Sequence, residues 1–320
     1  MRRLTRRRGV PRLADERGAV AVMVALLMVP LLGFGAIAVD VASLYSDRAQ
    51  LRNAADAAAV AVALDCARGN CGNTLATATA ALHANAGSAD AAGATLRTPT
   101  VSAPAITSSG GAVTVTVSAD QAHWFAPVLG QESTRVSASA TAAWATTTRG
   151  RANFPLAISL CEYQAQVARY PLGNTTPQRI NDQTGNKPCR DQAGTRITGG
   201  YAVTMPDDPS VCRTTSTLGG TIEEYPRKYG GGLPSSCTSQ YLASLIGTDV
   251  LFPVWDSISP GGGIQVYSYA AFHLTGYDVR NHRDPALYGW FTYAAQQSDA
   301  ATNPTSTAPD LGARSVYLQG

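Results

Sequence analysis

An uncharged apolar run of 22 residues, Gly18 to Val39, stands near the start of the chain. Seven arginines precede this run within the first 17 residues, and Asp40 follows it. A hydrocarbon core of about 30 Å takes roughly 20 helical residues to cross, and a flank rich in basic residues stays in the cytoplasm. The run therefore predicts a single-pass transmembrane helix, residues 18–39, in the cell membrane. The basic segment 1–17 is expected in the cytoplasm and the remaining 281 residues outside it.

A cleavable secretory signal is the alternative interpretation of the same run. Ala36-Ile37-Ala38 resembles the small-residue site at which such signals are cut. However, the apolar core of a signal normally has about 7–15 residues, whereas the stretch before this site has about 20. The length favours a retained anchor.

The charge balance points to the membrane as the first partner. The chain has 25 basic and 22 acidic residues, and seven of the basic ones lie in the first 17 positions. The excess positive charge is thus a topology signal, and the exterior part is slightly acidic. The sequence predicts a lipid bilayer as a partner and no nucleic acid.

A helical pattern continues beyond the apolar run. Positions spaced alternately by three and four residues are mostly apolar, as in an amphipathic helix: Val41, Leu44, Arg48, Leu51, Ala55, Ala58 and Val62. Neither glycine nor proline occurs between Ala36 and Arg68. One helix is therefore predicted from about Glu16 to Cys66, with a kink at Pro30.

The part of this helix outside the membrane is rich in alanine. It is either a stalk or a packing element, because small side chains allow close approach to a sheet or to copies of the same helix. In the second interpretation, the helix-packing residues are Leu51, Ala55, Ala58 and Val62.

Two cysteines, Cys66 and Cys71, flank a Gly-Asn turn at the end of the helix. Residues 74–86 then have the pattern of a second helix, with Asn73 as N-cap and Gly87 just past its end. Half of a metal site is one interpretation of the cysteine pair, but no second Cys or His pair has suitable spacing. A disulfide that closes a helical hairpin is favoured.

Three stretches of this region resemble a known family. They are Arg17-Gly18-Ala19-Val20-Ala21-Val22, Ala36-Ile37-Ala38-Val39-Asp40-Val41 and Leu51-Arg52-Asn53-Ala54-Ala55-Asp56-Ala57-Ala58-Ala59. Through them, residues 15–65 are similar to the N-terminal segment of the TadE/TadG-like proteins of bacterial Tad (tight adherence, Flp) pilus-assembly systems. The resemblance implies a bitopic, pilin-related envelope protein whose long helix carries an exterior domain. It also implies other Tad pilus-assembly proteins or pilins as partners.

One position separates the branches of this family. Pseudopilins of the TadE kind carry a glutamate five residues after the glycine of Arg-Gly, and this chain has Met23 there. The chain therefore resembles the TadG branch, and processing between Gly18 and Ala19 is not implied. Some TadG-like proteins also carry an Asp-x-Ser-x-Ser metal motif, which the nearest string, Asp256-Ser257-Ile258-Ser259, does not match.

Residues 40–150 combine the helical segments with a strand pattern. Apolar and polar residues alternate around Val113, Val115 and Val117, and again from Val136. The glycines at 110–111 and at 130 are predicted connections between strands. We expect a pilin-like helical hairpin plus antiparallel strands that bury one face on the alanine-rich helix. The aromatic cluster His123-Trp124-Phe125 is interpreted as a core anchor in preference to a ligand site.

Residues 151–320 are richer in Gly, Pro and Tyr and hold the four remaining cysteines, Cys161, Cys189, Cys212 and Cys237. Four cysteines allow three connectivities, which spacing cannot separate. Strands are expected at 250–255, 264–275, 288–294 and 315–318, and a loop-rich insertion at 174–236. The predicted fold class is α+β: a long N-terminal transmembrane helix continuing into a pilin-like helix, then a disulfide-stapled, β-rich antiparallel exterior domain.

Catalytic, cofactor-binding and metal-binding motifs are not found. The four histidines lack metal-ligand spacing, and no Gly-x-Ser-x-Gly elbow occurs. A triad of Ser259 with His273 or His282 and Asp278 or Asp284 is a coincidence that single sequences often contain. The sequence therefore favours a non-enzymatic envelope component without cofactors. The alternatives are a membrane-anchored hydrolase with its site in residues 154–320, and a surface adhesin or ligand-binding protein.

Overall fold

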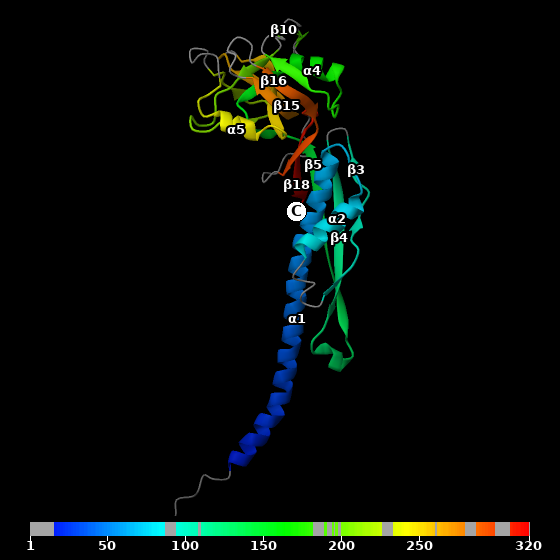
Figure 1. Ribbon diagram of the computed structural model, residues 1–320. Coiled ribbons are helices and arrows are strands. Elements are labelled where there is room, and N and C mark those ends of the chain that lie inside the picture. Colours follow the sequence, from blue (N-terminus) through cyan, green and yellow to red (C-terminus); the bar gives the residue numbers. More distant parts are fainter. Residues whose placement is uncertain are drawn as a thin grey trace, which may run out of the picture.

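The computed structural model describes residues 16–86, 94–107, 110–181, 189–190, 194, 196–197, 200–225, 233–259, 261–278, 286–297 and 308–319. A long helix, α1 (Glu16–Ala67), forms the axis of the molecule, and β-rich structure gathers around its C-terminal half (Figure 1). The predicted fold class, α+β with mainly antiparallel sheets, is confirmed. Among the described helices, α1 is the one long and apolar enough to cross a membrane, and none of its most apolar window is buried.

The helix α1 is continuous through Pro30, as the pattern predicts, and ends one residue beyond the predicted Cys66. Gly69 follows with a φ of 90°, a left-handed conformation that glycine adopts without strain. The Cys66–Cys71 disulfide closes the turn. Helix α2 (Thr74–Asn85) then begins at Asn73, whose side chain accepts a hydrogen bond from the Ala76 N–H at 3.1 Å. The expected terminal residue Gly87 lies outside the described residues.

The first sheet packs on the C-terminal half of α1. Its strand order is β1 (Ala94–Leu96), β4 (Gly110–Ala122), β5 (Ser133–Thr146), β18 (Ala313–Gln319) and β17 (Ala294–Gln297), with β2 (Thr100–Val101) and β3 (Ala105–Ile106) also on β4. The long hairpin β4–β5 pairs without interruption from Gly110 with Ala145 to Ala122 with Ser133. Val113, Val115 and Val117 of β4 are buried toward the helix, as alternation predicts.

The alanine face of α1 is filled by this sheet. The residues of that face have no exposed surface: Leu51, Ala54, Ala55, Ala58, Ala59, Val62 and Ala63. They share one core cluster with the valines of β4, Trp144 of β5 and Val316 of β18. The stalk interpretation is therefore wrong, and of the two packing surfaces considered, a sheet or a second helix, the described chain supplies the sheet itself.

The two glycines expected to mark a connection are the first residues of β4, next to the link from β3. Gly111 pairs with Trp144 of β5, and a Cβ at Gly111 would overlap the Trp144 indole. A Cβ at Gly110 would overlap the Trp144 carbonyl oxygen. These glycines therefore lie at the connection from β3 to β4, as predicted, and also permit close approach across the sheet.

The second sheet forms the body at the far end of α1. Its strand order is β11 (Tyr201–Val203), β7 (Leu156–Ser159), β14 (Asp249–Ile258), β15 (Ile264–Asp278), β16 (Ala286–Thr292) and β8 (Gln178–Asn181), with β13 (Thr221–Ile222) on β15. Two short pairs accompany it: β6 (Arg149–Ala152) with β12 (Thr214–Thr217), and β9 (Cys189–Arg190) with β10 (Arg196–Ile197). Among the described strands, β7–β14 and β17–β18 are parallel and the other pairs antiparallel.

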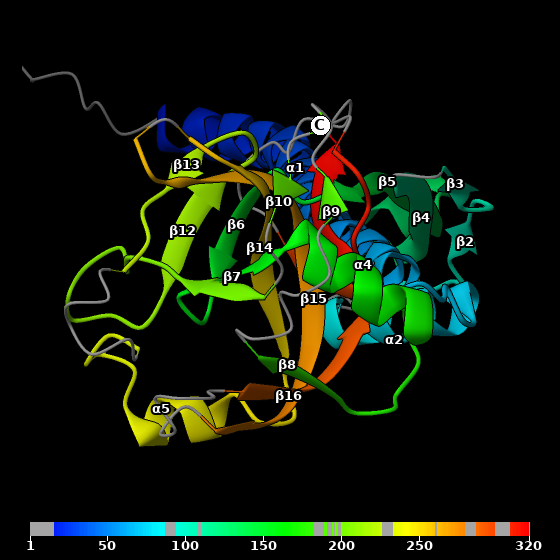
Figure 2. The same cartoon turned by 90° about the horizontal axis from the view of Figure 1, so that it is seen from above.

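Helices and aromatic rings close this second body. Helix α4 (Leu160–Arg169) follows β7 directly and lies over the sheet, whereas α5 (Ser239–Ser244) lies at its margin (Figure 2). The ring of Tyr163 from α4 meets Phe291 edge-on with centroids 4.9 Å apart, and Phe291 meets Phe272 at 5.1 Å. Helix α4 was not predicted from the sequence.

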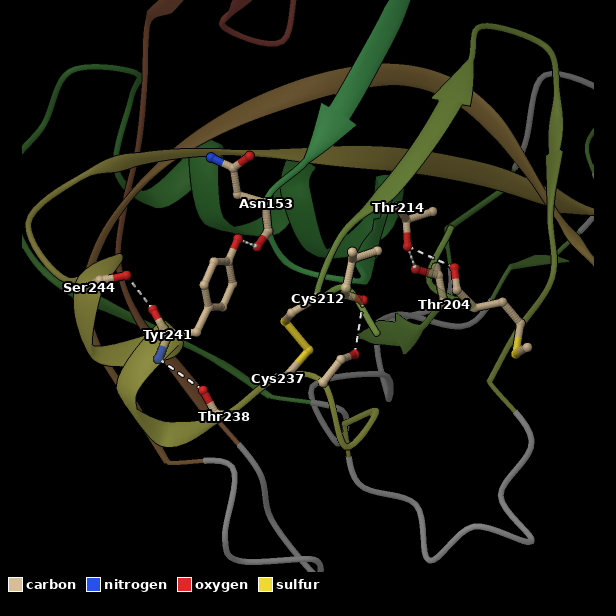
Figure 3. Close-up of a disulfide and its surroundings, with 11 residues drawn as sticks. Asn153, Thr204, Cys212, Thr214, Cys237, Thr238, Tyr241 and Ser244 are labelled. Carbon is tan, nitrogen blue, oxygen red and sulfur yellow. Dashed lines mark hydrogen bonds between the residues drawn. A yellow bond between two sulfur atoms is a disulfide. The ribbon is translucent and has the colours of Figure 1, made fainter. Parts of the chain in front are cut away.

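A disulfide between Cys212 and Cys237 ties α5 to the loops of this body (Figure 3). Beside it, the Tyr241 hydroxyl donates a hydrogen bond to the Asn153 carbonyl at 2.8 Å. Cys161 is also disulfide-bonded, whereas the side chain of Cys189 lies outside the described residues. The region expected as a loop-rich insertion thus carries short strands besides its loops.

Candidate functional site

The β4–β5 hairpin reaches down beside the apolar half of α1. We call residues 123–132, which join the two strands, the hairpin tip. The tip contains one short 3₁₀ turn, η1 (Ala126–Leu129), which ends at Gly130 in a left-handed conformation with a φ of 85°. Figure 1 shows this turn alongside α1, well away from the second body. The expected connection at Gly130 is therefore in place.

Asp40, the first residue after the apolar run, holds the tip. Its carboxylate accepts hydrogen bonds from the backbone N–H groups of Trp124 at 3.0 Å, Phe125 at 3.2 Å and Ala126 at 2.8 Å. We call this set of contacts the Asp40 clamp. Because its partners lie more than 80 positions further along the chain, the clamp fixes the hairpin to the helix at one height.

The clamp keeps the Asp40 side chain charged. Burial alone would raise the pKa of this carboxyl, but the hydrogen bonds from Trp124, Ala126 and Phe125 outweigh burial, so the pKa lies below its ordinary value of 3.8. Two helical turns further along, Asp47 is in the opposite situation. It is buried at the helix surface, its Oδ2 has no hydrogen-bond partner among the described residues, and burial raises its pKa.

Large apolar side chains of the tip are exposed. Trp124 retains 72% of its surface, Phe125 48% and Val128 90%. The interpretation of the His123-Trp124-Phe125 cluster as a core anchor is therefore wrong for Trp124 and Phe125. Asp40 binds the backbone of this cluster, and the rings of Trp124 and Phe125 lie outside the core.

An apolar groove of about 450 Å³ lies between the tip and α1. Helix residues on one side and tip residues on the other line it: Pro30, Gly33, Phe34, Ala36, Ile37 and Asp40 from α1, and Phe125, Ala126 and Val128 from the tip. The groove continues the exposed apolar surface of the helix without a charged side chain other than Asp40. Its surroundings suit a hydrocarbon environment better than an aqueous one.

The structure places the predicted helix-packing residues away from this groove. Leu51, Ala55, Ala58 and Val62 are all fully buried under the first sheet. They position the hairpin, and through it the tip, along the helix. The clamp and the groove were missed in the sequence because their partners are far apart along the chain.

The considered catalytic triad is not assembled. The His273 Nδ1 lies 2.7 Å from Asp249 Oδ1, and its ring stacks on Trp290 at 4.4 Å. Ser259 follows the last residue of β14, whereas His273 pairs with Asp249 at the start of β14, about nine strand residues or roughly 30 Å away. His282 and Asp284 lie outside the described residues. Within the described part of the chain, no group of three or more His, Cys, Asp or Glu side chains could hold a metal ion.

Comparison with known proteins concerns the helix. Residues 18–65 match the family model described as "Putative Flp pilus-assembly TadE/G-like". This segment is similar to the TadE/G-like family. No curated protein and no solved structure matches the chain.

The TadE/G-like segment includes most of the exposed and most of the buried half of α1. It spans the exposed apolar half, Asp40 and the alanine face under the first sheet. The hairpin tip and the second body lie outside the matched residues. The match of residues 18–65 therefore supports a role in pilus assembly and an anchoring helix, and the β-rich structure has to be interpreted from its own geometry.

Proposed function

We propose that this protein is a non-enzymatic structural component of a Tad/Flp-type pilus assembly or secretion system, with a TadG-like, minor-pilin-like role. The single observation that carries this proposal is the TadE/G-like match on helix α1. The N-terminal half of this helix is exposed, and the first sheet covers its C-terminal half. A helix of this kind can lie in lipid at one end and present a rigid exterior domain at the other. Its partners are the lipid bilayer and other Tad proteins or pilins.

The proposed topology is a cytoplasmic N-terminus and an extracytoplasmic C-terminal domain. The seven N-terminal arginines support this orientation. The disulfides Cys66–Cys71 and Cys212–Cys237 support it independently, because disulfides persist in oxidising compartments. Met23, at the position where TadE-like pseudopilins carry glutamate, supports the TadG-like assignment.

The proposed organisation has four parts: segment 1–17, membrane helix 18–39, pilin-like unit 40–150 and β-rich domain 151–320. The last two are interleaved, because β17 and β18 of the C-terminal part complete the sheet of β4 and β5. An exterior domain that closes on its own anchor helix is suited to a fixed structural role.

Topology is tested by fusing a reporter after residue 320. Alkaline phosphatase at that position should be active and a cytoplasmic reporter inactive. The assembly role is tested in the native host by deleting the gene and restoring it with the intact chain. Pili should be lost and then recovered, and the restored protein should co-purify with Tad components. Normal piliation in the deletion strain would reject the proposal.

A further inference from the structure

We propose that the hairpin tip enters the outer leaflet of the lipid bilayer beside α1, so that the protein meets the membrane at two points. This inference rests on the proposed membrane anchoring of α1. It adds a lipid-binding surface outside the TadE/G-like segment, built from Trp124, Phe125 and Val128.

The tip lies at the height of the C-terminal half of the apolar run. The Asp40 clamp fixes the backbone of residues 124–126 at the end of the apolar run. The groove lining then extends along α1 from Asp40 to Pro30. Ten helical residues rise about 15 Å, which is half of a hydrocarbon core of about 30 Å. The tip therefore lies beside the part of α1 that occupies one leaflet.

The surface of the tip is apolar and exposed. Trp124-Phe125-Ala126-Pro127-Val128-Leu129 contains no charged residue. Tryptophan is enriched where a membrane meets water, and aliphatic side chains favour the hydrocarbon below it. The 90% exposure of Val128 and 72% exposure of Trp124 would leave a concentrated apolar patch in water. Insertion removes that patch from water.

Most backbone N–H groups of the tip have acceptors within the protein. Lipid tolerates a polypeptide only where its N–H groups already have acceptors. Here the first three N–H groups of the apolar stretch bond to Asp40, and Pro127 has none. The Val128 N–H bonds to the Phe125 carbonyl at 3.2 Å, and the Gly130 N–H to the Pro127 carbonyl at 3.0 Å. The N–H groups of His123 and Gln131 also have carbonyl partners.

Lipid is favoured over a protein partner because the groove is continuous with the exposed apolar surface of α1. The groove shares its helix wall with the exposed apolar surface that extends to Val20, so the medium that covers this part of α1 also reaches the groove. Seven backbone N–H groups of the tip already have acceptors within the protein, which suits a hydrocarbon environment. Two contact points would fix the rotation of α1 and the height of the exterior body above the membrane.

The test uses the full chain reconstituted in liposomes that contain phosphatidylcholine brominated on its acyl chains. The chain has four tryptophans, and Trp144 and Trp255 are buried in the protein. Comparison of the wild-type chain with Trp124→Phe isolates the emission of Trp124. We expect the brominated lipid to quench that component strongly and aqueous acrylamide to leave it nearly unchanged.

A charge placed on the tip should reverse this pattern. Val128→Asp changes a side chain that is 90% exposed and therefore disturbs no packing. We expect this variant to float with liposomes, because α1 still anchors it, while Trp124 becomes accessible to acrylamide. The matched control is Ile106→Asp, on an exposed position of β3 away from the tip, which should leave lipid quenching unchanged.

The outcomes separate this inference from the proposed function. A wild-type chain that fails to float would reject the anchoring and with it both proposals. A chain that floats while Trp124 is quenched by acrylamide and not by brominated lipid would overturn tip insertion alone. Shielding of Trp124 from both quenchers would also overturn it, because the tip would then be covered by protein.

Discussion

At the scale of single residues, Asp40 and Asp47 show how burial of one residue type has opposite consequences. Asp40 accepts hydrogen bonds from three backbone N–H groups and is held charged, whereas Asp47 is almost equally buried and its Oδ2 has no hydrogen-bond partner in the part of the chain that the structure describes. The sequence places both on one helix but cannot show this difference, because the donors to Asp40 come from residues 124–126. Asp40 therefore stabilises the contact of helix and hairpin, and the burial of Asp47 destabilises the fold.

The Asp40 clamp should be pH-sensitive. The lowered pKa means that the charged clamp stabilises the fold above the ordinary value of 3.8 and that this stabilisation is lost as the pH falls below 3.8 toward the folded-state value. Hydrogen exchange should show the amides of residues 124–126 protected at pH 6 and less protected at pH 3. Asp40→Ala should remove that protection at both values. Asp56→Ala, a change to another half-buried carboxylate of α1, should leave it intact; unchanged protection in Asp40→Ala would contradict the clamp.

Asp47 should show the opposite pH dependence. Its raised pKa means that burial costs nothing below 3.8, where the carboxyl is neutral in both states, and that stability falls as the pH rises through the raised folded-state value. Asp47→Asn removes the charge and should raise the free energy of unfolding at pH 7 by about 1–3 kcal/mol. Denaturant unfolding at pH 7 and pH 3.5 measures this, and the gain should shrink at the lower pH. A loss of stability at pH 7 would contradict the assignment.

At the scale of elements, the contact of α1 with β4 and β5 holds the first sheet to the long helix. Replacing Ala55 and Ala58 by leucine keeps helix propensity nearly constant but forces bulk into a fully packed interface. We expect a loss of about 1–3 kcal/mol for each change, seen as an earlier denaturant midpoint and faster proteolysis of the β4–β5 hairpin.

The same helix provides the control for this prediction. Arg52→Leu with Asn53→Leu places the same number of leucines on its exposed face and should leave the hairpin resistant to protease. A stable Ala55→Leu/Ala58→Leu variant would mean that the sheet is not tightly docked, and the alanine face would then be available to pilins.

The elements that the sequence predicted well are those with long local periodicity. Helix α1 and the strands β4, β5 and β15 follow from spacing alone, because each repeats its pattern over many residues. Helix α4 was missed although Ser159 and Glu162 carry the Ser-x-x-Glu capping pattern, and the Ser159 hydroxyl does accept the Glu162 N–H at 3.1 Å. The exposure of Trp124 and the place of Gly111 in a strand depend on distant partners, Asp40 and Trp144, and no local pattern reports them.

At the scale of the whole molecule, the C-terminal strands make one structure of two bodies. Strand β18 pairs with β5 along the first sheet, while the isolated bridges of Leu311 and Gly312 to Ala270 connect the same segment to β15 of the second sheet. The end of the chain therefore returns to the anchor helix on which the fold begins. A force applied to the second body would reach α1 through this segment.

Arg314 is the residue through which this coupling should be tested. Its guanidinium pairs with Asp310 at 2.6 Å, donates to the Ala67 carbonyl at the end of α1 at 3.2 Å and lies 4.5 Å from the centre of the Tyr293 ring. The pair with Asp310 is largely buried, and removing one partner of a buried ion pair costs about 3–5 kcal/mol. We expect Arg314→Ala to lower stability by an amount approaching that range and to split thermal unfolding into two transitions. Arg97→Ala breaks an ion pair on an exposed surface and should cost less than about 1 kcal/mol with a single transition. Identical melting of the two variants would show that the bodies are joined by the strand pairing of β18 alone, and the arginine would then have no part in transmitting force to the membrane helix.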